Sequence, residues 1–240
     1  REPNRTDYEN GAPKPEKLND FELGWRIKKE KIQVQANLYW MEYQDQLVLT
    51  GAIDEVGAPI RQNVGESRRL GVEVDAIIQL TDQWLWKPNL AFSSNKNLDF
   101  YFKRDGILKN LGETQLAFSP NAVLGNAIIF APSTGFQIGL LSKYVGKQYM
   151  GNIDAENSTL AAYFVSDLNA VFTWQPRRWV KEIQWSTTVN NIFNLKYESN
   201  GYFYTYDDDF SSPGQITTIE GAGYYPQAGI HFLTGLKLTF

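Results

Sequence analysis

Alternation of apolar and polar side chains constrains this 240-residue chain more than any other feature. The clearest case is segment 230–240, where mostly apolar even positions alternate with mostly polar odd ones. Successive side chains of a strand point to opposite faces, so a period of two places one apolar face on each strand. The pattern recurs in segments 21–28, 32–40, 72–80 and 164–174, and helical spacing is hard to find. The chain is therefore predicted to be all-β.

The alternation predicts nine strands joined by connections of two lengths. The predicted strands cover residues 18–28, 32–50, 66–80, 84–98, 115–131, 135–150, 163–174, 182–193 and 227–240. The short connections are 29–31, 81–83, 131–135 and 175–181. The long connections are 51–65, 97–113, 151–162 and 196–225. Short and long connections alternate, as they do when an antiparallel up-and-down meander places all its short turns at one end and its long loops at the other.

Composition excludes several classes of protein. The net charge is −4, with 23 Lys and Arg against 27 Asp and Glu, whereas a nucleic-acid-binding protein needs a basic surface to neutralise phosphates. With no cysteine and a single histidine, His231, the chain lacks the groups for thiol catalysis, cysteine zinc sites or histidine-rich metal sites. No run of about 18 apolar residues is present, so no helix is expected to span a bilayer. We expect no enzyme, no cofactor or metal, and no nucleic-acid partner.

Alternation alone fits two architectures. In a soluble sandwich or lipocalin-like barrel the apolar face points into a core, whereas in a membrane barrel it points to lipid. Three features favour the membrane barrel: strands long enough for the about 9–11 tilted residues that cross a bilayer, aromatic residues near strand ends, and the unequal connections. The alternative is a soluble all-β carbohydrate-binding module, whose surface aromatics would stack on sugars.

Four runs of the sequence resemble those of TonB-dependent outer-membrane receptors. They are 37–47 (NLYWMEYQDQL), 67–74 (SRRLGVEV), 190–197 (NNIFNLKY) and 225–229 (YPQAG). The last strand adds a further likeness, because its pattern of Gly235, Leu238 and a terminal Phe240 resembles the sorting signal read by the outer-membrane assembly machinery. The likeness extends from Pro15 to Phe240 and covers nearly the whole chain.

The resemblance implies a transmembrane β-barrel of about twenty-two strands, plugged by an N-terminal domain that contacts TonB. Nine predicted strands make residues 1–240 the expected C-terminal portion of such a barrel, with the plug domain and the N-terminal strands absent. The chain starts at Arg1 rather than Met, so we expect a processed chain or a piece of a longer one.

The resemblance also implies a place and a function. The location would be the bacterial outer membrane, with short turns in the periplasm and long loops outside. The implied partners are outer-membrane lipid, the outer-membrane assembly machinery, the TonB complex through the missing plug, and a small-molecule ligand such as an iron–siderophore complex. The implied function is binding and import of a scarce nutrient, by default a ferric siderophore or haem, with energy delivered through TonB.

The predicted loop 196–225 is the richest candidate for ligand capture. Its aromatic and acidic candidates are Tyr197, Tyr202, Tyr204, Tyr206, Asp207, Asp208 and Asp209. Tyrosine rings stack on flat ligands at little entropic cost, because few torsions must be fixed. The alternative is that the tyrosines form an interface girdle, and that the acidic run is solvated or binds Ca²⁺.

Overall fold

The computed structural model describes residues 2–240 except 10, 55–56, 58 and 177–178. Its strands are β1 (Lys17–Lys28), β2 (Ile32–Ile53), β3 (Pro59–Gln79), β4 (Trp84–Arg104), β5 (Ile107–Gln115), β6 (Ala122–Ser133), β7 (Phe136–Val145), β8 (Gln148–Tyr149), β9 (Thr159–Leu160), β10 (Tyr163–Trp174), β11 (Glu182–Asn190), β12 (Glu198–Asp208), β13 (Thr217–Pro226) and β14 (His231–Thr239). The helical elements are α1 (Arg5–Glu9) and the 3-10 turn η1 (Glu156–Ser158). In the part of the chain that the structure describes, no helix has the length and hydropathy that a membrane-crossing helix requires.

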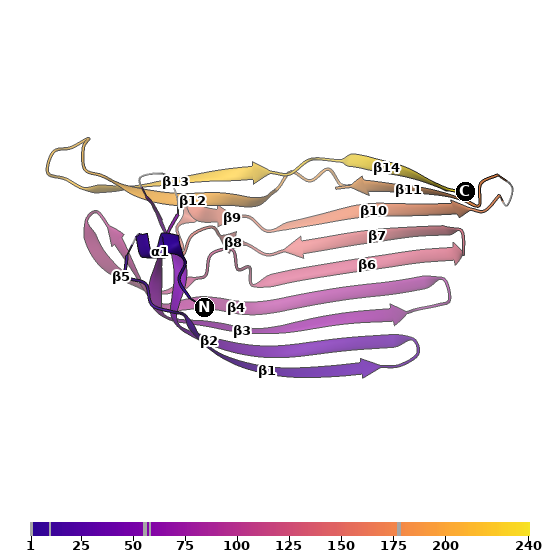
Figure 1. Cartoon of the computed structure of the whole chain (residues 1–240), viewed down its shortest axis with the longest axis horizontal. Helices are drawn as coiled ribbons and strands as arrows, with labels where there is room; N and C mark the ends of the chain where they lie inside the picture. The colour runs from indigo at the N-terminus through magenta and orange to yellow at the C-terminus, as the bar shows by residue number, and fades with distance from the viewer. Residues whose placement is uncertain (1, 10, 55–56, 58, 177–178) are drawn as a thin grey trace.

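Twelve strands form one large sheet, and β8 and β9 form a small second one. Nine strands of the large sheet make an antiparallel meander in the order β1, β2, β3, β4, β6, β7, β10, β11 and β14. Figure 1 shows the short turns at the end of the sheet where the C-terminus lies, and the longer connections at the opposite end. The predicted all-β fold and the antiparallel order of the predicted strands are confirmed.

The prediction was wrong about much of the long connections. Segment 97–113 belongs largely to β4 and β5, and segment 196–225 contains the β12–β13 hairpin. Segment 51–65 lies largely in β2 and β3, apart from residues 55–56 and 58, which lie outside the described residues. Conversely, the predicted strand 115–131 begins only at Ala122. These hairpins were missed because their sequences mix aromatic, glycine and polar residues on both faces, so they lack the apolar alternation.

The register of the meander places most of the apolar residues of all nine strands on one face, which we call the apolar face. At one edge Leu23 of β1 pairs with Leu38 of β2, and at the other edge Trp185 of β11 pairs with Leu236 of β14. These side chains are exposed, with 69% of Leu23 and 66% of Leu236 accessible. A continuous exposed apolar surface of this kind needs a cover, and in outer-membrane barrels that cover is lipid.

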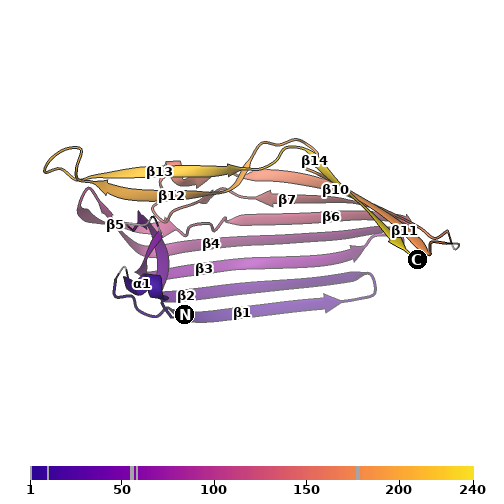
Figure 2. The same ribbon diagram turned by 45° about the horizontal axis from the view of Figure 1, so that its top comes forward.

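The buried core lies at the long-connection end, which we call the loop end, and not in the middle of the sheet. A cluster of buried side chains consists of Val48, Val64, Phe100, Phe102 and Leu116. Figure 2 shows α1, β5 and the β12–β13 hairpin together at this end of the sheet. The loop end therefore has a small hydrophobic core of its own, at one end of the sheet.

Candidate functional site

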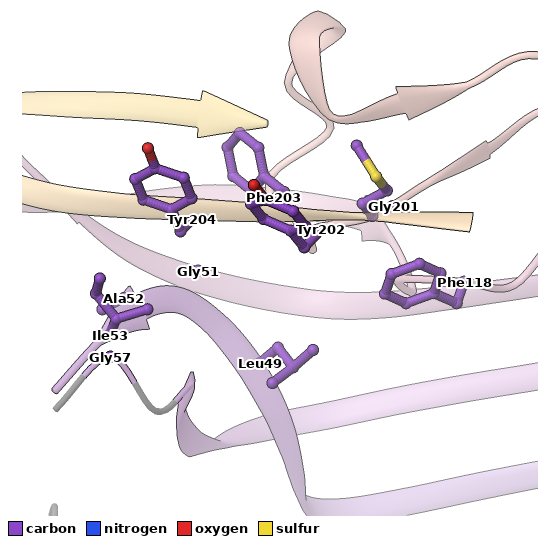
Figure 3. Close-up of a pocket in the computed structure, with 11 residues that line it drawn as sticks. Leu49, Gly51, Ala52, Ile53, Gly57, Phe118, Gly201, Tyr202, Phe203 and Tyr204 are labelled. Carbon is purple, nitrogen blue, oxygen red and sulfur yellow. The ribbon is translucent and has the colours of Figure 1, made fainter. Parts of the chain in front are cut away.

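The β12–β13 hairpin lies beside the end of β2 and encloses a cavity there. A single parallel bridge between Thr205 of β12 and Ala52 of β2 joins these segments, which are far apart in the sequence. The cavity has a volume of about 400 Å³ and is shown in Figure 3. Leu49 and Ile53 line it from β2, and Tyr202–Tyr204 line it from β12. We call this space the aromatic cavity.

Three predicted site tyrosines form a ladder on β12. The ring centroids of Tyr202 and Tyr204 lie 6.2 Å apart, and those of Tyr204 and Tyr206 lie 6.5 Å apart, all nearly parallel. Glycines on β13 make room for this ladder, because a Cβ atom at Gly223 would overlap the Tyr202 ring and one at Gly221 would overlap the Tyr204 ring. The rings thus lie across β13 and leave Tyr202 about half exposed.

Tyr197 lies apart from this ladder. Its ring stacks on Tyr163 at the loop end of β10, with the centroids 4.5 Å apart. It lines a different cavity of about 320 Å³, together with Asp167 and His231. Partial burial, with a smaller contribution from the charge of Asp167, raises the pKa of the Tyr197 hydroxyl above its ordinary value. The structure therefore does not bring Tyr197 together with the other predicted site tyrosines.

The three predicted acidic residues also have separate surroundings. Asp207 accepts a hydrogen bond from the Thr218 hydroxyl at 2.9 Å, and its carboxylate lies 3.7 Å from the Lys103 ammonium. Asp208 accepts hydrogen bonds from Ser211, which lower the pKa of the Asp208 carboxyl below its ordinary value. Asp209 is exposed. Among the described residues, no group of three or more metal-ligating side chains is found.

A second cavity, of about 570 Å³, lies on the other side of the bridge between β12 and β2. Tyr206 and Asp207 line this cavity together with Lys103 of β4. Its wall therefore carries charges of both signs, unlike the described wall of the aromatic cavity. Of the predicted site residues, Tyr202 and Tyr204 line the first cavity and Tyr206 and Asp207 line the second.

The turn between β4 and β5 contacts β13 of the β12–β13 hairpin through an ion pair and hydrogen bonds. Arg104 forms an ion pair with Glu220 of β13. Asp105 and Thr218 exchange two hydrogen bonds, from the Asp105 amide to the Thr218 hydroxyl at 2.7 Å and from the Thr218 amide to the Asp105 carboxylate at 2.9 Å. These contacts hold two loop-end hairpins in one arrangement.

The ion pair predicts a charge-reversal result. Arg104→Glu should place like charges opposite each other and loosen the β12–β13 hairpin, because repulsion replaces attraction at a partly buried position. Adding Glu220→Arg to the same chain should restore the pair. Hydrogen exchange of the β13 amides measures both effects, and equal exchange in all three proteins would contradict this role of the pair.

Asn152 was not among the predicted site residues. It is 2% exposed and connects three segments of the loop end. Its carbonyl oxygen accepts a hydrogen bond from the Ala117 amide at 2.8 Å, and its amide group donates to the Leu49 carbonyl at 2.7 Å. It also lies in hydrogen-bonding contact with Asn97 of β4. A lone asparagine in a connection gives no periodic signal, so nothing in the sequence distinguished it.

Asp154 also supports the loop end, and its ionisation predicts an effect of pH. Partial burial raises the pKa of its carboxyl, while a 2.8 Å hydrogen bond from the Gln115 amide acts in the opposite direction. Because the folded pKa lies above the unfolded one, this group stabilises the fold most at acidic pH and loses that contribution as pH rises through the folded pKa.

Asp154→Asn should therefore retain or increase the exchange protection of the Gln115 amide near neutral pH, since the amide oxygen still accepts the hydrogen bond without a charge. Asn also suits the backbone at this position, where φ is +52°. Asp154→Ala should reduce the protection. Lower protection in the Asn variant than in the wild type would contradict the expected cost of burying the carboxylate.

The chain matches known membrane receptors. Residues 3–195 match the family described as TonB dependent receptor-like, beta-barrel. The pesticin receptor of Yersinia enterocolitica is 25% identical over 191 residues, which cover 78% of this chain and 26% of that receptor. The chain thus spans about a quarter of the length of the curated relatives that it matches.

Solved structures show the same fold. The copper transporter OprC has a TM-score of 0.64 and 22% identity, over 94% of this chain and 32% of that one. The siderophore receptor PiuA from Acinetobacter baumannii has a TM-score of 0.63 and 17% identity, over 95% and 30% of the two chains. The ferric yersiniabactin uptake receptor FyuA from Yersinia pestis has a TM-score of 0.58 and 17% identity, over 92% of this chain and 30% of that one.

The sequence alone fitted both a soluble β-sandwich or lipocalin-like barrel and a membrane barrel, and these matches favour the membrane barrel. The family consists of transporters without enzymatic activity that reside in the bacterial outer membrane and work through TonB. The expectation of a non-enzymatic protein is confirmed at this level, and the alternative of a soluble carbohydrate-binding module is set aside. The chain belongs to the TonB-dependent receptor β-barrel family.

Proposed function

We propose that residues 1–240 form the C-terminal portion of a plugged barrel of about twenty-two strands, with the plug and the remaining strands supplied by the parent protein. The nine-strand meander supports this proposal, since it supplies less than half of such a barrel and leaves β1 and β14 each with one partner strand in the described sheet. The short turns would then lie in the periplasm and the loop end outside the cell.

On the same proposal, β14 presents the assembly signal. Gly235 pairs with Ser186, and Leu238 pairs with Ile183. Leu238 and Phe240 are exposed, at 45% and 72%. An exposed final strand with one free edge suits recognition by machinery that adds strands to it, because main-chain hydrogen bonds and alternate side chains are both accessible.

We propose that the parent receptor binds and imports a scarce nutrient, with a ferric siderophore preferred to haem, using energy delivered through TonB. The observation that carries this proposal is an aromatic cavity at the loop end of a sheet whose apolar face suits lipid. Relatives named for siderophore uptake, PiuA and FyuA, support the choice of cargo, while OprC is named for copper.

Within this function Tyr202, Tyr204 and Tyr206 would contact the ligand, and Asp207 would orient it at the edge of the second cavity. Tyr197 would contact the ligand at the separate cavity that it lines together with His231. Asp208 and Asp209 would lie at the outer tip of the hairpin, where they contribute negative charge.

Uptake of radioactive iron tests the proposal. Cells that lack the gene are supplied with the full-length receptor and offered a panel of ferric siderophores and haem under iron limitation. The proposal expects uptake of at least one ferric siderophore, which is lost when TonB is deleted. TonB-dependent uptake of haem without any siderophore would overturn the choice of cargo, and no TonB-dependent uptake of any of these compounds would overturn the function.

A further inference from the structure

The backbone at Phe118 is unusual. Six described residues other than glycine have positive φ, and five of them are aspartate or asparagine. Those two residue types tolerate the left-handed region because their short side chains form local hydrogen bonds. The sixth is Phe118, with φ at +54°. A bulky aromatic residue in this region is strained, and such strain persists only where surrounding contacts impose it.

The surrounding contacts are present on both sides of Phe118. Its amide donates to the Tyr149 carbonyl at 2.7 Å, and the preceding amide, that of Ala117, donates to the Asn152 side chain at 2.8 Å. Leu116 is buried in the loop-end core. The turn is therefore held firmly enough to keep the Phe118 backbone strained.

Packing does not explain why an aromatic residue occupies this position. The Phe118 side chain is 41% exposed, so the strain is not offset by complete burial of the ring. The ring instead forms part of the wall of the aromatic cavity. Figure 3 shows Phe118 at one end of the cavity, with Tyr204 and Ile53 at the other end in this view. Glycine would relieve the strain at this site but would remove that part of the wall.

The wall of the cavity indicates the chemistry of its occupant. Every side chain that the structure describes among the lining residues is uncharged, and four of these residues are aromatic: Phe118, Tyr202, Phe203 and Tyr204. Aromatic rings favour stacked or edge-to-face contact with another ring, and an apolar wall offers an ionised group no compensation for lost water. Charged side chains line the neighbouring cavity instead, including Lys103 and Asp207.

We infer that Phe118 determines ligand specificity, and that its ring, together with the aromatic residues of β12 that line the aromatic cavity, binds an uncharged aromatic group of the ligand. The inference rests on the proposed function, in which this cavity captures the ligand. It assigns the recognition of charged parts of the ligand to other surfaces. Phe118 would keep its strained backbone because the position of the ring is needed for binding.

Two probes of matched shape test the inference: benzamide, which is neutral, and benzoate, which is anionic. Binding is measured by saturation-transfer-difference NMR on the full-length receptor in lipid nanodiscs, with empty nanodiscs as a blank. We expect benzamide to bind about tenfold more tightly than benzoate, because the uncharged wall does not compensate the carboxylate for the water that it loses. Phe118→Ala and Phe118→Gly should each weaken benzamide binding to a similar degree. Phe118→Tyr keeps an aromatic ring at this position and should bind benzamide as the wild type does.

Phe210→Ala is the matched control, because Phe210 is 76% exposed on the same hairpin and is not among the described residues of the cavity wall. It should leave benzamide binding unchanged. Hydrogen exchange of residues 115–121 separates binding from folding: Phe118→Gly should keep or increase the protection of this segment while binding is lost. If Phe118→Gly loses protection and binding together, the ring is a packing residue and the inference fails.

The inference also fails if benzoate binds as well as benzamide, if benzamide does not bind, or if Phe118→Ala leaves its binding unchanged. None of these measurements needs TonB or iron. Loss of iron uptake with intact benzamide binding would overturn the proposed function alone, whereas siderophore uptake without benzamide binding would overturn this inference alone.

Discussion

Leu140→Arg should prevent most of the protein from assembling in the outer membrane. Leu140 lies near the middle of β7 on the apolar face, where it pairs with Ile128 of β6 and Leu168 of β10. If lipid covers that face, arginine places a charge near the midplane of the bilayer. The cost there is about 2–4 kcal/mol for transmembrane barrels, which is a large fraction of the stability of a typical protein.

The neighbouring residue provides a matched control. Leu141 has the same side chain on the same strand, but it points to the opposite face, where it pairs with Ala127 and Asp167. Leu141→Arg would lie on the wet face and close to a carboxylate, so it should assemble normally. Outer-membrane fractionation of the full-length receptor, followed by heat-modifiable migration on a gel, measures both variants. Equal assembly of the two variants would contradict the assignment of the faces.

Asn152→Ala should loosen the whole loop end. The substitution leaves the Ala117 amide and the Leu49 carbonyl without the partner that each has at 2.8 Å and 2.7 Å. A buried polar group without a partner costs about 1–3 kcal/mol, so two such groups together give a loss of about 2–6 kcal/mol. The turn that carries Phe118 and the β2 segment that lines the aromatic cavity would both lose a fixed contact.

Hydrogen exchange and limited proteolysis of the assembled receptor measure this loss. We expect faster exchange in β5, the end of β2 and the β12–β13 hairpin, with unchanged exchange in the meander, because the meander's ladders do not involve Asn152. Asn157→Ala is the control, since Asn157 is exposed and the Tyr224 hydroxyl reaches its backbone carbonyl rather than its side chain. Unchanged loop-end exchange in Asn152→Ala would show that other contacts hold the segments together.

The strands of the meander were predicted well because each of them lies between an apolar and a polar environment. Such a strand must alternate apolar and polar side chains from one residue to the next. Strands such as β1 and β10 were placed within one residue of their observed bounds. The loop end does not meet this condition. In β12 and β13 the tyrosines face glycines rather than lipid, so the segment carries no apolar face and was predicted as a loop.

The candidate site was predictable only in part. Composition drew attention to the tyrosines of 196–225, and their period of two is visible at Tyr202, Tyr204 and Tyr206 once a strand is known. The opposite wall comes from β2 and from Phe118, and nothing in the local sequence shows that these segments meet. Residues whose role depends on a long-range contact or on an unusual backbone conformation do not follow the alternation of side chains, so their role cannot be predicted from it.

The absence of cysteine from the chain permits a direct test of how the sheet is oriented in the membrane. Asp209 lies at the exposed tip of the β12–β13 hairpin, and Asp82 lies in the exposed turn between β3 and β4, at the opposite end of the sheet. Single Asp209→Cys and Asp82→Cys variants of the full-length receptor, with any cysteine elsewhere in that protein replaced, are treated in intact cells with a maleimide that does not cross the outer membrane. We expect labelling of Asp209→Cys in intact cells and of Asp82→Cys only after the outer membrane is opened. Labelling of Asp82→Cys in intact cells, or protection of Asp209→Cys, would contradict a loop end that faces the outside of the cell.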